Sequence, residues 1–325
     1  MPDAAPWIFL TGENGMGKTV LLQALALGFN PQSKIININN GDPFDSSFKI
    51  LVSTYENMVY ETKLLNPSEW EIMPYLSCYG PSRLQVLTEN DQNEKIGYLP
   101  GLNRLFGNHT FLKNIDFELI MWELKAGFEG TSHEMKVVFQ QKIAFTKRLF
   151  IEMLDIKGVE IDIAENIVWY LEKGTDKSTL KKVRRNDLGA GYRNLIGLVG
   201  DMIINLSINQ GIVNPSDLCG VVLIDEIELH LHPKWQKSLP AILSKFFPKI
   251  QFIASTHSPL PIMGAPENSV ILKVDRTAEN GIEVKRLKKV EQDLKYLLPN
   301  AVYSSDIFGL SDFASNDGVE MDKIL

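Results

Sequence analysis

The sequence predicts an α/β fold, in which a mostly parallel sheet flanked by helices carries an antiparallel β subdomain and a helical insertion. Three observations lead to this prediction. A glycine-rich loop at residues 12–19 lies between an apolar strand and a helix, the middle of the chain has helical periodicity at 112–157, and the later half alternates apolar strands with helices. Such alternation indicates parallel strands that are covered on both faces.

The first element is an apolar strand at residues 7–10, and the glycine-rich loop leads from it into a helix over about 20–27. The loop matches the pattern G-x-x-x-x-G-K-[ST], in which backbone N–H groups and a helix N-terminus surround an anion. Lys18 is expected to reach the β- and γ-phosphates of a nucleoside triphosphate, and Thr19 to ligate Mg²⁺. The predicted phosphate-binding residues are Gly12, Glu13, Asn14, Gly15, Met16, Gly17, Lys18 and Thr19.

The next elements are predicted strands and a helical region. A strand at 34–39 precedes three runs that suggest an antiparallel subdomain, at 48–55, 58–63 and 73–79. The helical middle ends before a short strand at 167–172. We therefore expect four parts: an N-terminal lobe with the loop (1–110), a helical insertion (111–185), a C-terminal lobe (186–290) and a C-terminal docking segment (291–325).

Two acidic residues follow a strongly apolar strand at 221–224, after a helix over about 191–209. Asp225 at the end of a buried strand can hold Mg²⁺ through water, and Glu226 can orient or deprotonate an attacking water. A helix at 233–246 and a strand at 251–255 lead to His257, which can contact a γ-phosphate and sense its loss. Ligand sites in open α/β sheets lie at strand carboxyl ends, so these residues and the loop are expected to form one site.

This set of motifs resembles ATP-binding-cassette (ABC) type ATPases, and the resemblance implies an ABC-type P-loop ATPase core. The signature candidate is the segment 186–193, which in that family crosses a head-to-tail dimer and points a helix N-terminus at the partner subunit's γ-phosphate. The residues that the resemblance assigns to nucleotide binding there are Leu188, Gly189, Ala190, Gly191 and Tyr192. Gly189 stands where a serine hydroxyl is common, so one contact of the family pattern is missing.

The segment 225–236 is similar to the DEIELHLHP.WQ stretch of soluble RecF/OLD-like ATPases, and several segments are similar to ATPase subunits of Septu-type antiphage systems. The resemblance implies ATP and Mg²⁺ as cofactors, Thr19 and Asp225 as metal ligands, and Glu226 and His257 as catalytic residues. It also implies a nucleotide-sandwich homodimer or a higher assembly that regulates a separate effector nuclease, of the HNH type. The C-terminal remnant is too short for the Toprim nuclease of full-length OLD enzymes.

Other functions stay open at this point. A RecF- or SMC-like repair ATPase would bind DNA directly, and the formal net charge of −7 counts against it. Gly189 keeps open an ATP-sensing module with little turnover. A transporter ATPase is the least favoured alternative. No run is long enough to span a membrane and no signal-peptide pattern begins the chain, so we expect a cytoplasmic protein.

A few residues are less clearly assigned by the sequence. His230 and His232 form an H-x-H pair that could bind zinc, but the family pattern explains both as loop residues at the dimer face. Only eleven residues precede Gly12, so the sequence does not identify the adenine platform of the family pattern, for which Trp7 is a candidate. Arg83 could face phosphate or be an ordinary surface arginine.

Overall fold

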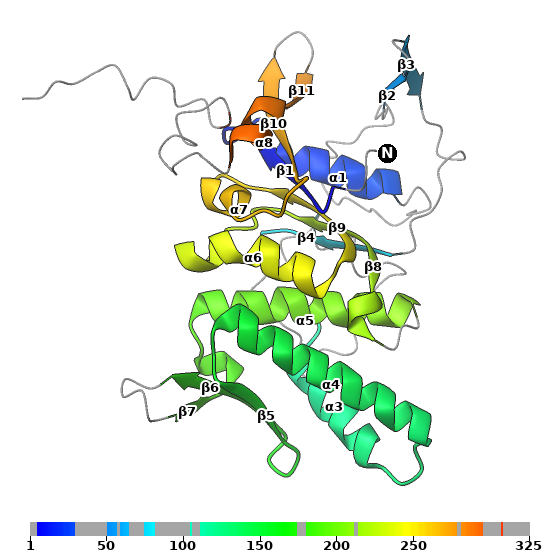
Figure 1. The fold of residues 1–325 in the computed structure, drawn as a ribbon, viewed down its shortest axis with the longest axis vertical. Coiled ribbons are helices and arrows are strands. Elements are labelled where there is room, and N and C mark those ends of the chain that lie inside the picture. The colour runs from blue at the N-terminus through cyan, green and yellow to red at the C-terminus, as the bar shows by residue number, and fades with distance from the viewer. Residues whose placement is uncertain are drawn as a thin grey trace, which may run out of the picture.

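The computed structural model describes residues 5–29, 51–56, 59–64, 75–81, 105, 111–173, 180–210, 214–277, 281–294 and 307 of the 325-residue chain. Its centre is a six-stranded sheet in the order β11-β10-β1-β9-β8-β4 (Figure 1). Every neighbouring pair in this sheet is parallel except β10 and β11. The predicted α/β fold with a mostly parallel sheet is therefore confirmed.

The strands and helices of the central layers follow the predicted order along the chain. The strands are β1 (Trp7–Thr11), β4 (Leu76–Tyr79), β8 (Cys219–Ile224), β9 (Lys249–Ser255), β10 (Val270–Thr277) and β11 (Gly281–Arg286). The helices are α1 (Lys18–Phe29), α5 (Ala190–Gln210), α6 (Pro233–Phe246), α7 (Pro259–Met263) and α8 (Lys288–Asp293). No helix in the described residues is both long and apolar enough to cross a membrane.

The central sheet has a hydrophobic core on each face, because side chains alternate along a strand. On one face, Leu10, Val221 and Leu223 pack with residues of α1. On the other face, Phe9 and Val222 join the larger core formed with α3 to α6. This double coverage explains why the parallel strands are nearly continuous apolar runs.

One predicted strand pairs differently from our expectation. The run at 73–79 was predicted to complete an antiparallel subdomain, but β4 joins the central sheet and runs parallel to β8. Its residues Ser77, Cys78 and Tyr79 are fully buried, which suits a strand covered on both faces. The antiparallel ladder therefore has two strands, β2 (Leu51–Glu56) and β3 (Val59–Leu64). The predicted strand at 34–39 lies outside the described residues.

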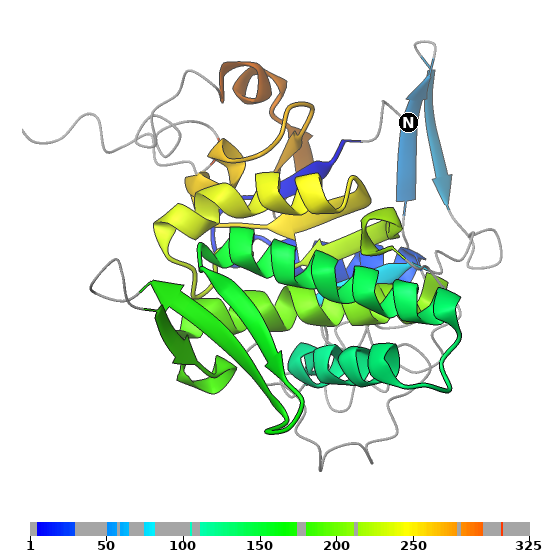
Figure 2. The ribbon, with the colours of Figure 1, turned by 60° about the horizontal axis from the view of Figure 1, so that its bottom comes forward.

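The predicted helical insertion forms two helices, α3 (Ile115–Gly127) and α4 (His133–Leu154). Asn114 and Ser132 cap their N-termini by accepting hydrogen bonds from backbone N–H groups. A three-stranded antiparallel sheet follows, made of β5 (Gly158–Asp162), β6 (Ile167–Lys173) and β7 (Leu180–Val183). Figure 2 shows these helices beside α5, with the small sheet at one end. The four-part division of the chain stays a prediction.

Candidate phosphate-binding site

The glycine-rich loop lies between β1 and α1, at the carboxyl edge of the sheet. Gly12 approaches β10 so closely that a Cβ atom there would lie 2.3 Å from the carbonyl oxygen of Val274. Both Gly12 and Gly17 have positive φ angles, of 135° and 97°, which glycine adopts without steric cost. Lys18 Nζ donates hydrogen bonds to the carbonyl oxygens of Gly12 and Glu13, both at 2.8 Å. These two hydrogen bonds fix the Lys18 ammonium group against the backbone of the loop.

Lys18 is a buried cation in a cluster of carboxylates. Its side chain is buried, and this burial lowers the pKa of Lys18 from its ordinary value. The negative charges of Asp225, Glu228 and Glu226 act in the opposite direction and favour the charged form. An anion such as a phosphate would add to that stabilisation of the charged ammonium.

Thr19 and Asp225, the predicted metal ligands, meet across the sheet edge. Thr19 Oγ1 donates a hydrogen bond of 2.7 Å to Asp225 Oδ2. The other carboxylate oxygen of Asp225 accepts a hydrogen bond from the hydroxyl of Ser255. Asp225 is buried, and its backbone N–H donates to the carbonyl of Tyr79 at 2.8 Å. A hydroxyl beside a carboxylate is an oxygen donor set that suits Mg²⁺, so these residues fit the implied ion.

Glu226 begins the turn after β8 in a left-handed backbone conformation, with a φ of 48°. This region is uncommon for residues other than glycine and calls for support from the surroundings. Ser255 supplies that support: its hydroxyl accepts a hydrogen bond of 2.7 Å from the Glu226 N–H, and its carbonyl accepts one of 3.1 Å from the Ile227 N–H. Ser255 therefore holds both Asp225 and Glu226. Ser255 has no role among the residues predicted from the sequence, although a serine that ends an apolar strand is a signal for one.

His257 lies just after β9 and is tied to the turn that carries Glu226. Its backbone N–H donates a hydrogen bond of 2.6 Å to Glu228 Oε1. Burial is the main cause that lowers the pKa of His257 from 6.5, and the positive charge of Lys18 lowers it further. The other oxygen of Glu228, Oε2, is buried and accepts no hydrogen bond within the described residues. Glu228 is thus a second residue of this site that sequence reasoning did not assign.

The predicted signature segment begins α5 on the molecular surface. Leu188 is buried, whereas Gly189 and Ala190 are exposed. The Arg193 N–H donates to the Gly189 carbonyl at 3.1 Å, which starts the helix at that point. A Cβ atom at Gly189 would meet only the ring of Tyr192, at 3.7 Å. The backbone around Gly189 therefore has room for a side chain.

The signature segment packs against the loop that follows Glu226. A Cβ atom at Gly191 would lie 2.8 Å from the carbonyl oxygen of His230 and 3.1 Å from the ring of Trp235. Asn194 Nδ2 donates a hydrogen bond of 2.7 Å to the Leu229 carbonyl. The start of α5 is therefore in direct contact with the loop that follows Asp225 and Glu226.

A cleft of about 630 Å³ opens beside this junction. Its lining includes Gly189, Gly191, Tyr192, His230, His232 and Trp235. His232 caps α6, because its Nδ1 accepts a hydrogen bond of 3.3 Å from the Lys234 N–H. In the described part of the chain, no group of three or more His, Cys, Asp or Glu side chains is arranged to hold a metal ion.

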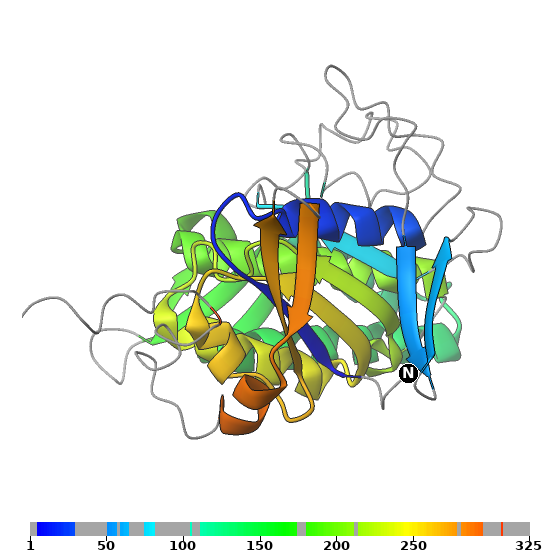
Figure 3. The same ribbon diagram turned by 90° about the horizontal axis from the view of Figure 1, so that it is seen from above.

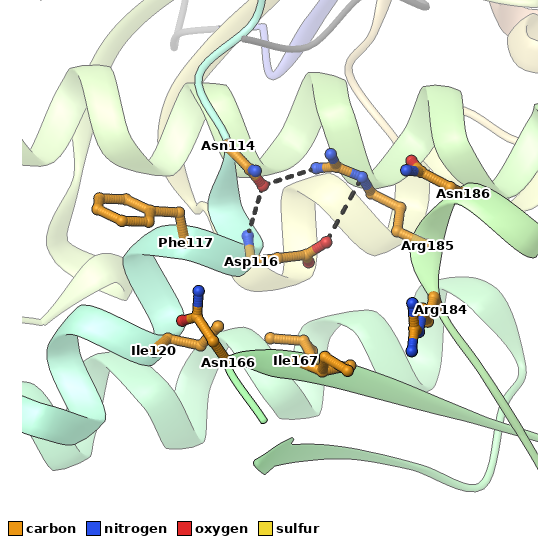
Figure 4. Close-up of a pocket in the computed structure, with 10 residues that line it drawn as sticks. Asn114, Asp116, Phe117, Ile120, Asn166, Ile167, Arg184, Arg185 and Asn186 are labelled. Carbon is orange, nitrogen blue, oxygen red and sulfur yellow. Dashed lines mark hydrogen bonds and ion pairs between the residues drawn. The ribbon is translucent and has the colours of Figure 1, made fainter. Parts of the chain in front are cut away.

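A second, smaller pocket of about 190 Å³ lies behind the signature segment, between α3 and β6 (Figure 4). Arg185 belongs to the 3-10 helix η3 (Arg185–Asp187) and pairs with Asp116, with 3.5 Å between Nε and Oδ2. Arg185 also donates a hydrogen bond of 3.0 Å to Asn114 Oδ1, and the Tyr170 hydroxyl donates one of 2.6 Å to Asp116. Burial raises the pKa of Asp116. This cluster ties η3, and with it the signature segment, to the helical insertion.

Two minor sequence hypotheses have different outcomes. Trp7 is fully buried, with its ring stacked on Phe9 and Phe252 at centroid distances of 5.3 and 4.5 Å. Its indole Nε1 donates a hydrogen bond of 2.8 Å to the hydroxyl of Ser244 in α6. Trp7 is a core residue, so its assignment to the adenine base is wrong. Arg83 lies outside the described residues.

The fold and the site resemble those of AAA/ABC-like P-loop ATPases. The family model described as "AAA domain, putative AbiEii toxin, Type IV TA system" matches residues 187–262. This match spans residues 187–193 of the signature segment, Asp225, Glu226 and His257.

Curated relatives extend the similarity to most of the chain. It is 28% identical over 323 residues to the Septu protein PtuA of Bacillus mycoides (strain KBAB4), over 95% of this chain and 41% of that protein. It is 30% identical over 246 residues to the "Retron Vc95 probable ATPase" of Vibrio cholerae serotype O1 biovar El Tor, over 74% of this chain and 40% of that protein. The predicted resemblance to a Septu-type ATPase is thus confirmed, and the chain spans about two fifths of the length of these relatives.

Among solved structures, the SMC head domain from Thermotoga maritima aligns with a TM-score of 0.44 and 11% identity. The alignment covers 86% of this chain and 90% of that chain.

Proposed function

We propose that this chain is the ATP-binding and ATP-hydrolysing part of a bacterial antiphage defence complex, in which it regulates a separate effector nuclease. The observation that carries the proposal is the convergence of Lys18, Thr19, Asp225, Glu226 and His257 at one edge of the sheet. The similarity to PtuA and to a retron ATPase supports the defence role.

In the proposed reaction, Lys18 exchanges its two carbonyl partners for phosphate oxygens and compensates their negative charge. Mg²⁺, held by Thr19 and Asp225, would supply further charge compensation at the β- and γ-phosphates. Glu226 accepts a proton from the attacking water while the bond between the γ-phosphorus and ADP breaks. His257, whose pKa is lowered, is neutral at pH 7 and can donate a hydrogen bond to the γ-phosphate.

The second half of the proposed reaction site lies on another copy of the chain. The first-turn N–H groups of a helix have no partners within it, and Gly189, which precedes α5, has no side chain with which to cap those of α5. Such donors suit an anionic γ-phosphate presented by a partner subunit. We therefore propose a homodimer with two nucleotides between its subunits, with residues 188–192 of each copy completing the other copy's site.

The dimer is tested with the variant Glu226→Gln, which keeps the shape of the side chain but removes the base. Light scattering should show twice the mass of one chain in the presence of ATP and Mg²⁺, and one chain with ADP. The matched control is the double variant Lys18→Ala/Glu226→Gln, which should remain at the mass of one chain. A mass that does not change with ATP would contradict the proposed dimer.

The partner is tested by purifying a tagged chain that is expressed from its native operon. An HNH-type nuclease that co-purifies, together with loss of phage protection in the Lys18→Ala variant, would support the proposal. A chain that purifies alone and binds DNA tightly in a salt-dependent way would favour the repair ATPase instead.

A further inference from the structure

The order of the strands indicates on which side of the loop the nucleotide base must lie. Asp225, Glu226 and His257 follow β8 and β9, on one side of β1. A triphosphate whose γ-phosphate meets these residues extends along the loop and away from them. On the opposite side of β1, the next strands are β10 and β11. The ribose and base of the nucleotide are therefore directed toward the β10–β11 hairpin.

The hairpin places one aliphatic side chain directly over the phosphate loop. Ile282 Cδ1 lies 2.5 Å from the position that a Cβ atom of Gly17 would occupy. Figure 3 shows the two strands reaching the start of α1. Gly17 therefore serves two needs: its φ of 97° shapes the loop, and its missing side chain leaves room for Ile282.

The elements at this contact, α1 and β11, carry further exposed apolar side chains. Ile282 is 36% exposed, and Val284, two residues further along β11 and on the same face of the strand, is 45% exposed. Val20, in the first turn of α1, is 40% exposed. We call Val20, Ile282 and Val284 the hairpin shelf. Aliphatic groups beside a strongly charged phosphate site suit a ligand that is anionic at one end and has a flat apolar face at the other.

We propose that the hairpin shelf is the base platform of the nucleotide site, with the purine ring lying on Ile282. This inference rests on the proposed function, since it requires a nucleotide at the phosphate loop. Trp7 cannot serve as this platform because it is fully buried in the core.

The test compares two ligands that share a triphosphate but differ in the base. Calorimetry would measure the affinity of wild-type protein for ATP and for inorganic tripolyphosphate, each with Mg²⁺. The variant Ile282→Ala should bind ATP about fivefold more weakly, as expected for the loss of a few tens of Å² of apolar contact. Its affinity for tripolyphosphate should stay unchanged. Ile282→Phe, which offers a flat ring to the base, should bind ATP at least as tightly as wild type.

The matched control is Ile163→Ala, in the turn between β5 and β6, where the isoleucine is 44% exposed. This variant should bind both ligands as wild type does. Equal weakening of both ligands by Ile282→Ala would show that Ile282 only supports the loop, and would overturn the proposal, as would unchanged ATP affinity. Wild-type protein that binds neither ligand would overturn the proposed function and this inference with it.

Discussion

Two regions of the candidate site are built in opposite ways. One is the phosphate edge, made of loop 12–19 with Asp225, Glu226 and His257, and the other is the part of the signature segment at residues 188–192. Hydrogen bonds within one chain close the phosphate edge: Thr19 bonds to Asp225 at 2.7 Å, and Ser255 bonds to both acidic residues. The signature segment instead presents Gly189 and Ala190 to solvent. The residues beside this exposed part make the contacts: Gly191 and Asn194 contact the loop after Glu226, and Arg185 bonds to Asn114 at the start of α3.

Because of this difference, we expect that nucleotide binding and turnover can be separated by mutation in this chain. In the proposed site, the phosphate edge of one copy supplies Lys18 to the phosphates and Thr19 and Asp225 to the metal. The signature segment leaves Gly189 and Ala190 exposed to solvent, so we expect it to act only when another copy brings a nucleotide to it. Variants of the two regions should therefore change different measured quantities.

The largest expected effect comes from breaking the phosphate edge at Lys18. Lys18→Ala should lower the affinity for ATP by about 100-fold or more, because it removes the buried cation from the loop. Calorimetric titration measures this. Lys249→Ala is the control, since it removes only an exposed pair with Asp217 and should leave ATP affinity unchanged. Wild-type affinity in Lys18→Ala would contradict the site.

Glu226→Gln should separate chemistry from binding at the same edge. The rate of phosphate release should fall by about 100-fold or more, because the amide cannot accept the proton of the attacking water. ATP affinity should remain within about twofold of wild type. Glu165→Gln, in the exposed turn between β5 and β6, serves as the control with normal turnover. Normal turnover in Glu226→Gln would exclude Glu226 as the base.

Arg185→Ala tests the support of the signature segment. The change leaves the mostly buried Asp116 without its cation, and should lower the free energy of unfolding by about 2 kcal/mol. Urea denaturation measures this loss. Lys182→Ala breaks an exposed pair with Glu160 and should cost less than about 1 kcal/mol. Equal losses in both variants would show that the Arg185 cluster is no stronger than a surface pair.

Gly189→Ser should raise the rate of ATP turnover rather than lower it. The site has room for the new side chain, and the added hydroxyl should raise turnover about tenfold through one hydrogen bond to a charged phosphate. Gly191→Ser is the matched comparison, and should lower turnover because its Cβ would meet the His230 carbonyl at 2.8 Å. Unchanged turnover in Gly189→Ser would favour an ATP-sensing module with little hydrolysis.

The smallest expected effect concerns the titration of His257 without nucleotide. Burial and the Lys18 charge lower the pKa of His257 below 6.5, so the unfolded chain takes up this proton before the folded chain does. The contribution of His257 to the free energy of unfolding is therefore constant above pH 6.5 and declines as the pH falls below it. His257→Gln should remove that part of the decline. An NMR titration midpoint of His257 at or above 6.5 would contradict the expectation.

Elements with strong local patterns could be predicted from the sequence. The bounds expected for α6, 233–246, are those of the structure, because a proline begins the helix and apolar residues repeat with its period. The strand β4 was assigned to the wrong sheet. Its four residues carry no local signal that distinguishes a parallel from an antiparallel neighbour, and only its pairing with β8 decides that.

The same division applies to the candidate site. Lys18, Thr19, Asp225, Glu226 and His257 could be named because each lies in a motif of consecutive residues. Ser255 and Glu228 were not assigned because they act across space: the bond from Glu226 to Ser255 joins residues 29 positions apart. Such a contact cannot be predicted from the composition of the sequence or the spacing of its residues.

The fold class and the position of the candidate phosphate loop could be predicted from the sequence alone, because a glycine-rich loop between a strand and a helix creates anion-binding geometry locally. Which distant segments meet at that loop depends on the tertiary structure and could not be predicted from the sequence. The order of the strands buried Trp7 in the core and brought Ile282, from near the other end of the chain, over Gly17. The physical reason is that strand neighbours are selected by the burial of both faces of the sheet, a property of the whole chain.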